Sequence, residues 1–150
     1  MGFRINPMVG THDATLIIAA SEKDANLYYA THFLAPDPFV YTEIRGKSYL
    51  LMSDLELDRA KTEAKVDEVL STSRLARELS KQKKSPTTVN IIDMLYRDHK
   101  VKIVLVPESF GFAYGEGLRK EGYRLVTKPE PFFEKRLFKT EDEVKKITET

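Results

Sequence analysis

The sequence predicts an α/β fold in which a mixed β-sheet is flanked by helices. Two short apolar runs, residues 14–20 and 101–106, contain β-branched side chains and are bounded by polar residues or proline, as buried strands are. Residues 39–53 form two strand-like runs separated by Gly46, which predicts a hairpin and therefore antiparallel pairing. From Asp54 onward, expected helices and strands alternate, which favours parallel pairing through helical crossovers.

The first half of the chain is expected to contribute mainly strands. Residues 14–20 form the first strand, and residues 26–33 follow a polar turn and are expected to form a short second strand. The segment Ala35-Pro36-Asp37-Pro38 is a loop, because its two prolines exclude both a helix and a central strand. In the hairpin, Gly46 can adopt the positive φ that a tight turn requires.

The second half is expected to contribute most of the helices. Asp54 is the expected N-cap of a helix over residues 54–65, and Ser85 is the expected N-cap of a helix that begins at Pro86. Gly122 is the expected C′ residue of a helix over residues 110–121. The remaining expected elements are a helix over residues 75–83 and strands over residues 66–70, 101–106 and 123–127.

Composition fits one globular domain and argues against several functions. The 150 residues are 41% hydrophobic and carry a net charge of +1, so no electrostatic argument favours nucleic acid or an anionic membrane. The absence of cysteine excludes a disulfide framework and a thiolate metal site within these residues. The longest apolar run is about seven residues, against the roughly twenty that a membrane span needs, and no signal peptide begins the chain. We therefore expect a soluble, cytoplasmic protein.

No residue pattern predicts a metal or nucleotide site. The three histidines, His12, His32 and His99, are not spaced as metal ligands on one element. Residues 111–117 are rich in glycine but lack the Gly-x-Gly-x-x-Gly spacing, and their bulky Phe112 would obstruct a pyrophosphate. We expect no metal and no cofactor in this chain.

Two alternatives remain open from the residues alone. Asp13 with Asp54 and Asp58 could serve a small Mg²⁺-dependent hydrolase of the ribonuclease H-like type, since clustered carboxylates hold Mg²⁺. Helix capping and pairing with nearby lysines explain the same carboxylates without chemistry. The other alternative is a stand-alone protein-interaction module, because aromatic residues are enriched at interfaces and several gather in one region. These residues are Tyr28, Tyr29, Phe33, Phe39 and Tyr41.

The last residues predict the beginning of a helix that the sequence does not complete. Thr140 and Glu143 form a capping box, and residues 141–143 place negative charge in the first turn. No glycine, proline or basic last turn ends this helix before Thr150. We therefore expect residues 1–138 to form one domain and residues 139–150 to begin a linker helix into a further, catalytic domain.

Two segments resemble the creatinase, prolidase and aminopeptidase P family. Residues 136–143, Arg-Leu-Phe-Lys-Thr-Glu-Asp-Glu, resemble the family's Arg-x-x-Lys-(Ser/Thr)-x-x-Glu junction between an N-terminal α/β domain and the pita-bread metallopeptidase domain. Residues 26–33, Asn-Leu-Tyr-Tyr-Ala-Thr-His-Phe, are similar to the family's Asn-(Leu/Ile)-x-Tyr-x-(Ser/Thr)-Gly-Phe stretch, except that His32 stands where the family usually has glycine. The resemblance implies a ribonuclease H-like, mixed-sheet N-terminal domain.

The resemblance also implies a function for the parent protein. It would be an Xaa-Pro dipeptidase or aminopeptidase P-like metallopeptidase with two divalent metal ions (Mn, Co or Zn), and its metal ligands would all lie beyond Thr150. This chain would then hold no catalytic residue and would contribute to a homo-oligomer, expected to be a dimer. In the family, the stretch at residues 26–33 and the loop after it face a neighbouring subunit's active site. This implies that His32, Phe33 and Leu34 help to restrict the access of proline-containing peptides.

Overall fold

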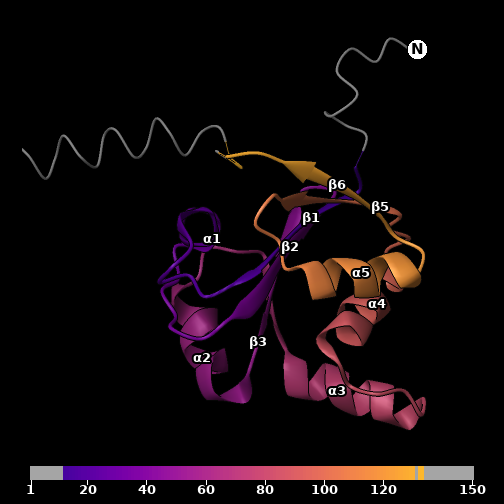
Figure 1. Ribbon diagram of the computed structural model, residues 1–150. Helices are drawn as coiled ribbons and strands as arrows, with labels where there is room; N and C mark the ends of the chain where they lie inside the picture. The colour runs from indigo at the N-terminus through magenta and orange to yellow at the C-terminus, as the bar shows by residue number, and fades with distance from the viewer. Residues whose placement is uncertain (1–11, 131, 134–150) are drawn as a thin grey trace, which may run out of the picture.

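The computed structural model describes residues 12–130, 132 and 133, and within them the chain forms a six-stranded mixed sheet (Figure 1). The strand order is β4-β3-β2-β1-β5-β6. Only β2 runs against its neighbours, because β1–β2 and β2–β3 are antiparallel while the other three pairs are parallel. The strands are β1 (Ala14–Ala19), β2 (Phe39–Ile44), β3 (Lys47–Met52), β4 (Glu68–Ser71), β5 (Ile103–Pro107) and β6 (Arg124–Lys128).

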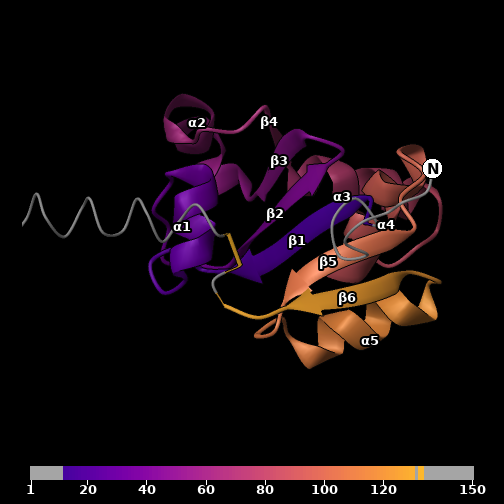
Figure 2. The same cartoon turned by 90° about the horizontal axis from the view of Figure 1, so that it is seen from above.

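In the same described residues, five helices flank this sheet, two on one face and three on the other (Figures 1 and 2). They are α1 (Ala25–Thr31), α2 (Asp54–Glu63), α3 (Thr72–Lys81), α4 (Thr88–Asp98) and α5 (Phe112–Lys120). Helices α1 and α2 cover what we call the two-helix face, and α3, α4 and α5 cover the three-helix face. The expected α/β architecture, with a mixed sheet and flanking helices, is thus confirmed.

Alternation along the strands divides the apolar side chains between two cores. Leu16 of β1 lies in the core under the three-helix face, and the next residue, Ile17, lies in the core under the two-helix face. Leu51 and Leu50 of β3 divide in the same way. The central strands are buried on both sides, so they appear in the sequence as continuous apolar runs.

The hairpin and one helix end follow the sequence prediction closely. Arg45 and Gly46 between β2 and β3 both have positive φ, at 47° and 90°, which matches the twist of the flanking strands in a two-residue turn. Gly122 after α5 has φ of 103°, as a C′ glycine requires.

Residues 26–33 form no strand, which corrects the sequence expectation. Most of this segment is helix α1: the Asp24 carboxylate caps it by accepting a hydrogen bond from the Leu27 N–H at 2.9 Å. Leu27 and Thr31, four residues apart, face the core, while Tyr28 is 42% exposed. The pair of tyrosines favours a strand by propensity alone, but capping and the burial of one helical side override that preference.

Two N-caps also differ from the expected residues. Ser53 precedes α2, and the Asp54 carboxylate accepts a hydrogen bond from the Ser71 hydroxyl at 2.9 Å instead of capping the helix. At α4, Thr87 is the cap, and its hydroxyl accepts a hydrogen bond from the backbone N–H of Asn90 at 3.1 Å. The Ser85 backbone carbonyl accepts from the side-chain amide of Asn90. Several adjacent polar residues could cap each helix, and the tertiary path of the chain selects among them.

Within the part of the chain that the structure describes, no helix is long and apolar enough to cross a membrane. The expected boundary at residue 138 and the linker helix over residues 139–150 lie outside the described residues.

Candidate functional site

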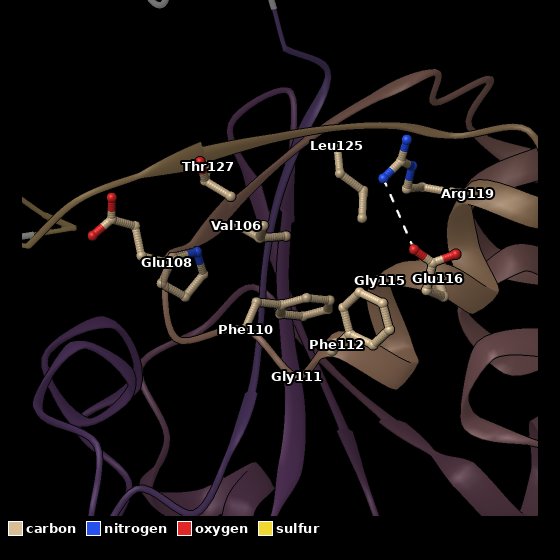
Figure 3. Close-up of a pocket in the computed structure, with 11 residues that line it drawn as sticks. Val106, Glu108, Phe110, Gly111, Phe112, Gly115, Glu116, Arg119, Leu125 and Thr127 are labelled. Carbon is tan, nitrogen blue, oxygen red and sulfur yellow. Dashed lines mark ion pairs between the residues drawn. The ribbon is translucent and has the colours of Figure 1, made fainter.

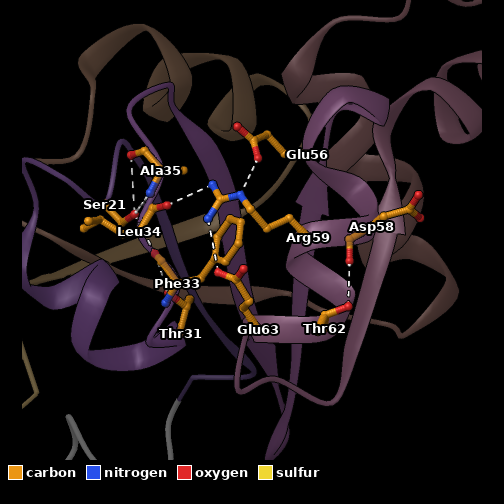
Figure 4. Close-up of polar contacts among 10 residues, drawn as sticks. All are labelled: Ser21, Thr31, Phe33, Leu34, Ala35, Glu56, Asp58, Arg59, Thr62 and Glu63. Carbon is orange, nitrogen blue, oxygen red and sulfur yellow. Dashed lines mark hydrogen bonds and ion pairs between the residues drawn. The ribbon is translucent and has the colours of Figure 1, made fainter.

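The segment that joins α1 to β2, residues 32–38, is held in place by its polar neighbours and is called here the presented loop (Figure 4). The buried Ser21 hydroxyl, just beyond β1, donates to the Phe33 carbonyl at 2.6 Å and accepts from the Ala35 N–H at 2.7 Å. The Glu22 N–H donates to the Ala35 carbonyl at 3.2 Å. These bonds attach the middle of the loop to the end of a central strand.

The beginning of the presented loop is set by Thr31 and His32. The Thr31 hydroxyl donates to the Leu27 carbonyl at 2.9 Å and accepts from the Phe33 N–H at 3.1 Å, which closes α1. His32 has φ of 53° and ψ of 28°, the left-handed conformation that glycine adopts with least strain. The position where the resembled family usually has glycine therefore does need a positive φ here, and His32 meets that need with an exposed side chain.

Arg59 of α2 holds the loop from the other side. Its guanidinium lies 4.3 Å from the centre of the Phe33 ring and donates through Nη2 to the Leu34 carbonyl at 3.0 Å. Glu56 and Glu63 orient it through contacts of 2.9 and 3.2 Å. The hydrogen bond to Glu56, together with the nearby carboxylate charges, raises the pKa of Arg59 above its ordinary value although partial desolvation opposes the shift. The guanidinium therefore remains charged and combines stacking with a backbone contact.

Of the three residues that the resemblance implies at a substrate cleft, the structure exposes two. Leu34 is 51% exposed and His32 is also exposed, whereas Phe33 is completely buried. The Phe33 ring packs edge-on against Phe39 at 6.0 Å, so Phe33 supports the loop from the core and has no surface with which to touch a peptide.

The aromatic cluster is mostly core. Phe33, Phe39 and Tyr41 are at most 5% exposed, and burial strongly raises the pKa of the Tyr41 hydroxyl. Tyr28 is the large exposed member at 42%. The cluster therefore does not form the aromatic patch through which the alternative interaction module was expected to pair.

The carboxylates of the hydrolase alternative do not gather at one place, because Asp13 and Asp54 lie at opposite ends of the strands. Asp13 precedes β1, Asp54 follows β3, and β1 and β3 run in the same direction. The two carboxylates are therefore separated by the length of one strand, which is roughly 20 Å at about 3.3 Å per residue. Asp58 lies on α2, where its carbonyl accepts from the Thr62 hydroxyl (Figure 4). The structure thus contradicts a shared Mg²⁺ site for these three residues, and no metal-holding group of His, Asp or Glu occurs among residues 12–130 and 132–133.

Asp13 instead joins three segments at the amino end of the sheet. Its Oδ2 accepts from the backbone N–H groups of Lys102 and Ile103 at 2.9 Å each, and its Oδ1 lies 3.5 Å from the Arg45 guanidinium. Burial alone would raise the pKa of this carboxyl, but the two backbone donors and Arg45 outweigh burial and lower it overall. The role of Asp13 is structural.

A cavity of about 210 Å³ lies between the ends of β5 and β6 and the beginning of α5 (Figure 3). Its wall is largely apolar and includes Phe110, Leu125 and Phe112, the last of which is 80% exposed. The Glu116–Arg119 ion pair, at 4.0 Å, stands beside it. We call it the α5 cavity. Its volume is below the 300–1,000 Å³ typical of small-molecule pockets.

The glycines near this cavity serve packing. A Cβ on Gly117 would lie 2.8 Å from Cγ2 of Val89, so glycine lets α5 approach α4 closely. Gly115 is buried beside Leu125. No signal in the sequence revealed the cavity.

Comparison with known proteins places the fold. No protein-family model and no curated protein matches the sequence. In structure, the chain is similar to an aminopeptidase P from Streptococcus thermophilus, with 18% identity and a TM-score of 0.60 over 81% of this chain and 83% of that chain. It is also similar to the creatinase/prolidase N-terminal domain of an X-Pro dipeptidase from Streptococcus pyogenes, with 11% identity and a TM-score of 0.54 over 81% of this chain and 86% of that chain.

A longer protein shows the same likeness over part of its length. The X-Pro aminopeptidase from Thermotoga maritima MSB8 is 15% identical with a TM-score of 0.62, and the match covers 79% of this chain but 31% of that chain. The chain therefore has the fold of the creatinase/prolidase N-terminal domain, and the resemblance inferred from residues 26–33 and 136–143 is confirmed at the level of the fold.

Proposed function

We propose that this chain is the non-catalytic N-terminal domain of an Xaa-Pro metallopeptidase of the aminopeptidase P or prolidase type. In this proposal it pairs subunits of a cytoplasmic homodimer and limits which peptides reach a neighbouring subunit's active site. The two divalent ions and their ligands belong to the catalytic domain, and this chain supplies none of them. Several chains of the same fold are described as peptidases for Xaa-Pro bonds, which supports the assignment.

The observation that carries the proposal is the combination of fold and coverage. The chain matches most of a separate N-terminal domain from an X-Pro dipeptidase but less than a third of a longer X-Pro aminopeptidase. Such a domain is a natural place for regulation of access, because it can narrow a cleft without taking part in the reaction. A narrowed cleft selects by rejecting long or bulky peptides.

The presented loop has the properties that such a barrier needs. Its hydrogen bonds with Ser21, Thr31 and Arg59 fix the loop backbone. The loop therefore loses little conformational entropy when it binds a neighbouring subunit or a peptide. His32 and Leu34 then extend outward from a fixed backbone. We assign the contact to these two residues and assign Phe33 a supporting role only.

The test begins with the reading frame that continues beyond Thr150. We expect it to encode two Asp, one His and two Glu ligands. The full-length protein should then hydrolyse Xaa-Pro dipeptides with added Mn²⁺ or Co²⁺, while residues 1–150 alone hydrolyse none.

In the full-length protein, Leu34→Gly should lower KM for longer proline peptides and leave kcat for a dipeptide within about twofold, because the barrier is removed and the metals are untouched.

Phe112→Ala is the matched control, since Phe112 is also exposed but lies on α5, outside the presented loop. A reading frame that ends at Thr150, with a chain that still associates, would favour the stand-alone interaction module instead. Equal changes for Leu34→Gly and Phe112→Ala would remove the presented loop from the proposal.

A further inference from the structure

Within the described part of the chain, the outer edge of β6 has backbone groups with no partner strand. β6 is the last strand in the sheet order and pairs only with β5 among the described residues (Figure 2). The Arg124 N–H donates inward to the Lys102 carbonyl at 3.0 Å, and the Lys128 carbonyl accepts from the Glu108 N–H at 3.3 Å. Backbone groups alternate in direction along a strand, so those of Leu125 and Thr127 point away from the sheet.

These groups could accept one more strand. Leu125 and Thr127 together provide two N–H donors and two carbonyl acceptors, the pattern that strand addition uses. Pro129, just beyond β6, has no N–H, which limits the available edge to these two residues.

The charges on β6 argue against a second copy of the same strand. Two β6 strands paired antiparallel about Val126 would place Arg124 of each opposite Lys128 of the other, and like charges directly opposite are destabilising. Cationic side chains on an edge strand are a common means of preventing self-pairing. The same two cations favour a strand whose matching positions are carboxylates.

The α5 cavity lies on the face of β6 opposite Arg124 and Lys128, and it adds a preference for apolar side chains on that face. Leu125 and Thr127 line the cavity, so the side chains that their pairing partners direct to this face would lie beside its apolar wall (Figure 3). Arg124, Val126 and Lys128 direct their side chains to the opposite face. The partner strand that fits therefore has acidic residues opposite Arg124 and Lys128, apolar residues opposite Leu125 and Thr127, and any residue opposite Val126.

We propose that the outer edge of β6 binds an extended acidic segment of a partner protein by strand addition. The segment places carboxylates beside Arg124 and Lys128 and apolar side chains beside the α5 cavity. This binding uses no residue of the presented loop, and it is independent of the proposed peptidase role.

The test is an NMR titration of the isotope-labelled chain with the peptide acetyl-Ser-Glu-Val-Thr-Val-Glu-Ser-amide. We expect saturable shifts of the Leu125 and Thr127 amides at peptide concentrations up to about 2 mM, with about tenfold weaker binding by the matched peptide in which both Glu are Lys. Raising the salt from about 50 mM to about 500 mM should weaken binding of the acidic peptide, because exposed charge pairs are screened.

The paired variant Arg124→Glu/Lys128→Glu should reverse the preference, so that the lysine peptide binds about tenfold better than the acidic one. Loss of folding cannot produce such a reversal. The control Lys61→Glu/Lys65→Glu makes the same charge change at α2 and just beyond it and should leave the preference unchanged. The proposal is overturned by equal binding of the two peptides, by no shift at β6, or by a chain that dimerises through β6.

Discussion

The two faces of the sheet are covered in different ways. The three-helix face is covered by α3, α4 and α5, which come from one stretch of chain, residues 72–120. The two-helix face has α1, of seven residues, and α2, in which Ala60 is the one buried residue. Its core is completed by Phe132, which follows the last strand and is 2% exposed.

This difference indicates what holds each face together. Both faces combine apolar burial with polar contacts: under the three-helix face the Thr42 and Tyr96 hydroxyls lie 2.7 Å apart, and the Tyr123 hydroxyl donates to Asp93 at 2.6 Å. The two-helix face has the smaller set of buried apolar residues, and it relies in addition on the attachments of its loop to Ser21, Thr31 and Arg59 and on Phe132. Regions with fewer buried apolar contacts open locally at lower free energy. The candidate site therefore lies on the face whose position depends most on a few specific contacts.

The largest effect that tests this contrast comes from a matched pair of leucines. Leu118 of α5 and Leu27 of α1 are both fully buried. We expect Leu118→Ala to reduce the free energy of unfolding by about 3–5 kcal/mol and Leu27→Ala by about 2–3 kcal/mol, because the short α1 can shift to fill part of the cavity. Urea denaturation of both variants measures the difference, and a larger loss for Leu27→Ala would contradict the contrast.

A smaller effect is expected at Phe132. Phe132→Ala should reduce the free energy of unfolding by about 2 kcal/mol, below the usual range for a core phenylalanine, because Phe132 lies in no helix or strand and its backbone can shift to fill part of the space. The ring of the neighbouring Phe133 lies 5.6 Å from the ring of Tyr29 in α1, so the variant should accelerate hydrogen exchange in α1. Hydrogen exchange in α4 should remain unchanged. Phe112→Ala is the control, since its 80% exposed ring predicts a change within about 0.5 kcal/mol. Equal acceleration in α1 and α4 would show that the two faces open together.

The smallest expected effect on stability is at Asp13, which supports neither face in particular. Asp13 has a pKa below its ordinary 3.8, so its contribution is complete above about pH 5 and is lost as the pH falls through its folded-state pKa. Asp13→Asn should therefore reduce the free energy of unfolding by about 1 kcal/mol at pH 7. The reduction should shrink as the pH falls below 3.8, where the carboxyl becomes protonated first in the unfolded and then in the folded state. Exchange in α1 and α4 should accelerate by the same factor, and a change confined to one face would show that Asp13 supports that face alone.

The sequence predicted the sheet better than the site. The hairpin at Gly46 and the apolar runs of β1 and β5 carry local signals, and the structure confirms them. Helix α1 was wrongly expected to be a strand, because its tyrosines favour strands and its cap residue Asp24 was not recognised. Phe33 was assigned to a surface because nothing local distinguishes a buried phenylalanine from an exposed one.

Arg59 shows the limit most clearly. Its spacing from Glu56 and Glu63 is visible in the sequence as helical ion pairs. Its contacts with Phe33 and with the Leu34 carbonyl, 25 residues away, are not visible, since they depend on how α2 packs beside the presented loop.

Apart from α1, local chemistry in the sequence determined which segments become strands and helices, because turn geometry and hydrophobic period act over a few residues. The order of these elements determined a mixed sheet. The tertiary structure alone decided that Phe33 is buried while His32 and Leu34 are exposed, that Asp13 and Asp54 lie at opposite ends of the strands, and that the outer edge of β6 has no partner strand among the described residues. Those outcomes depend on contacts between residues far apart in the chain, which no local pattern encodes.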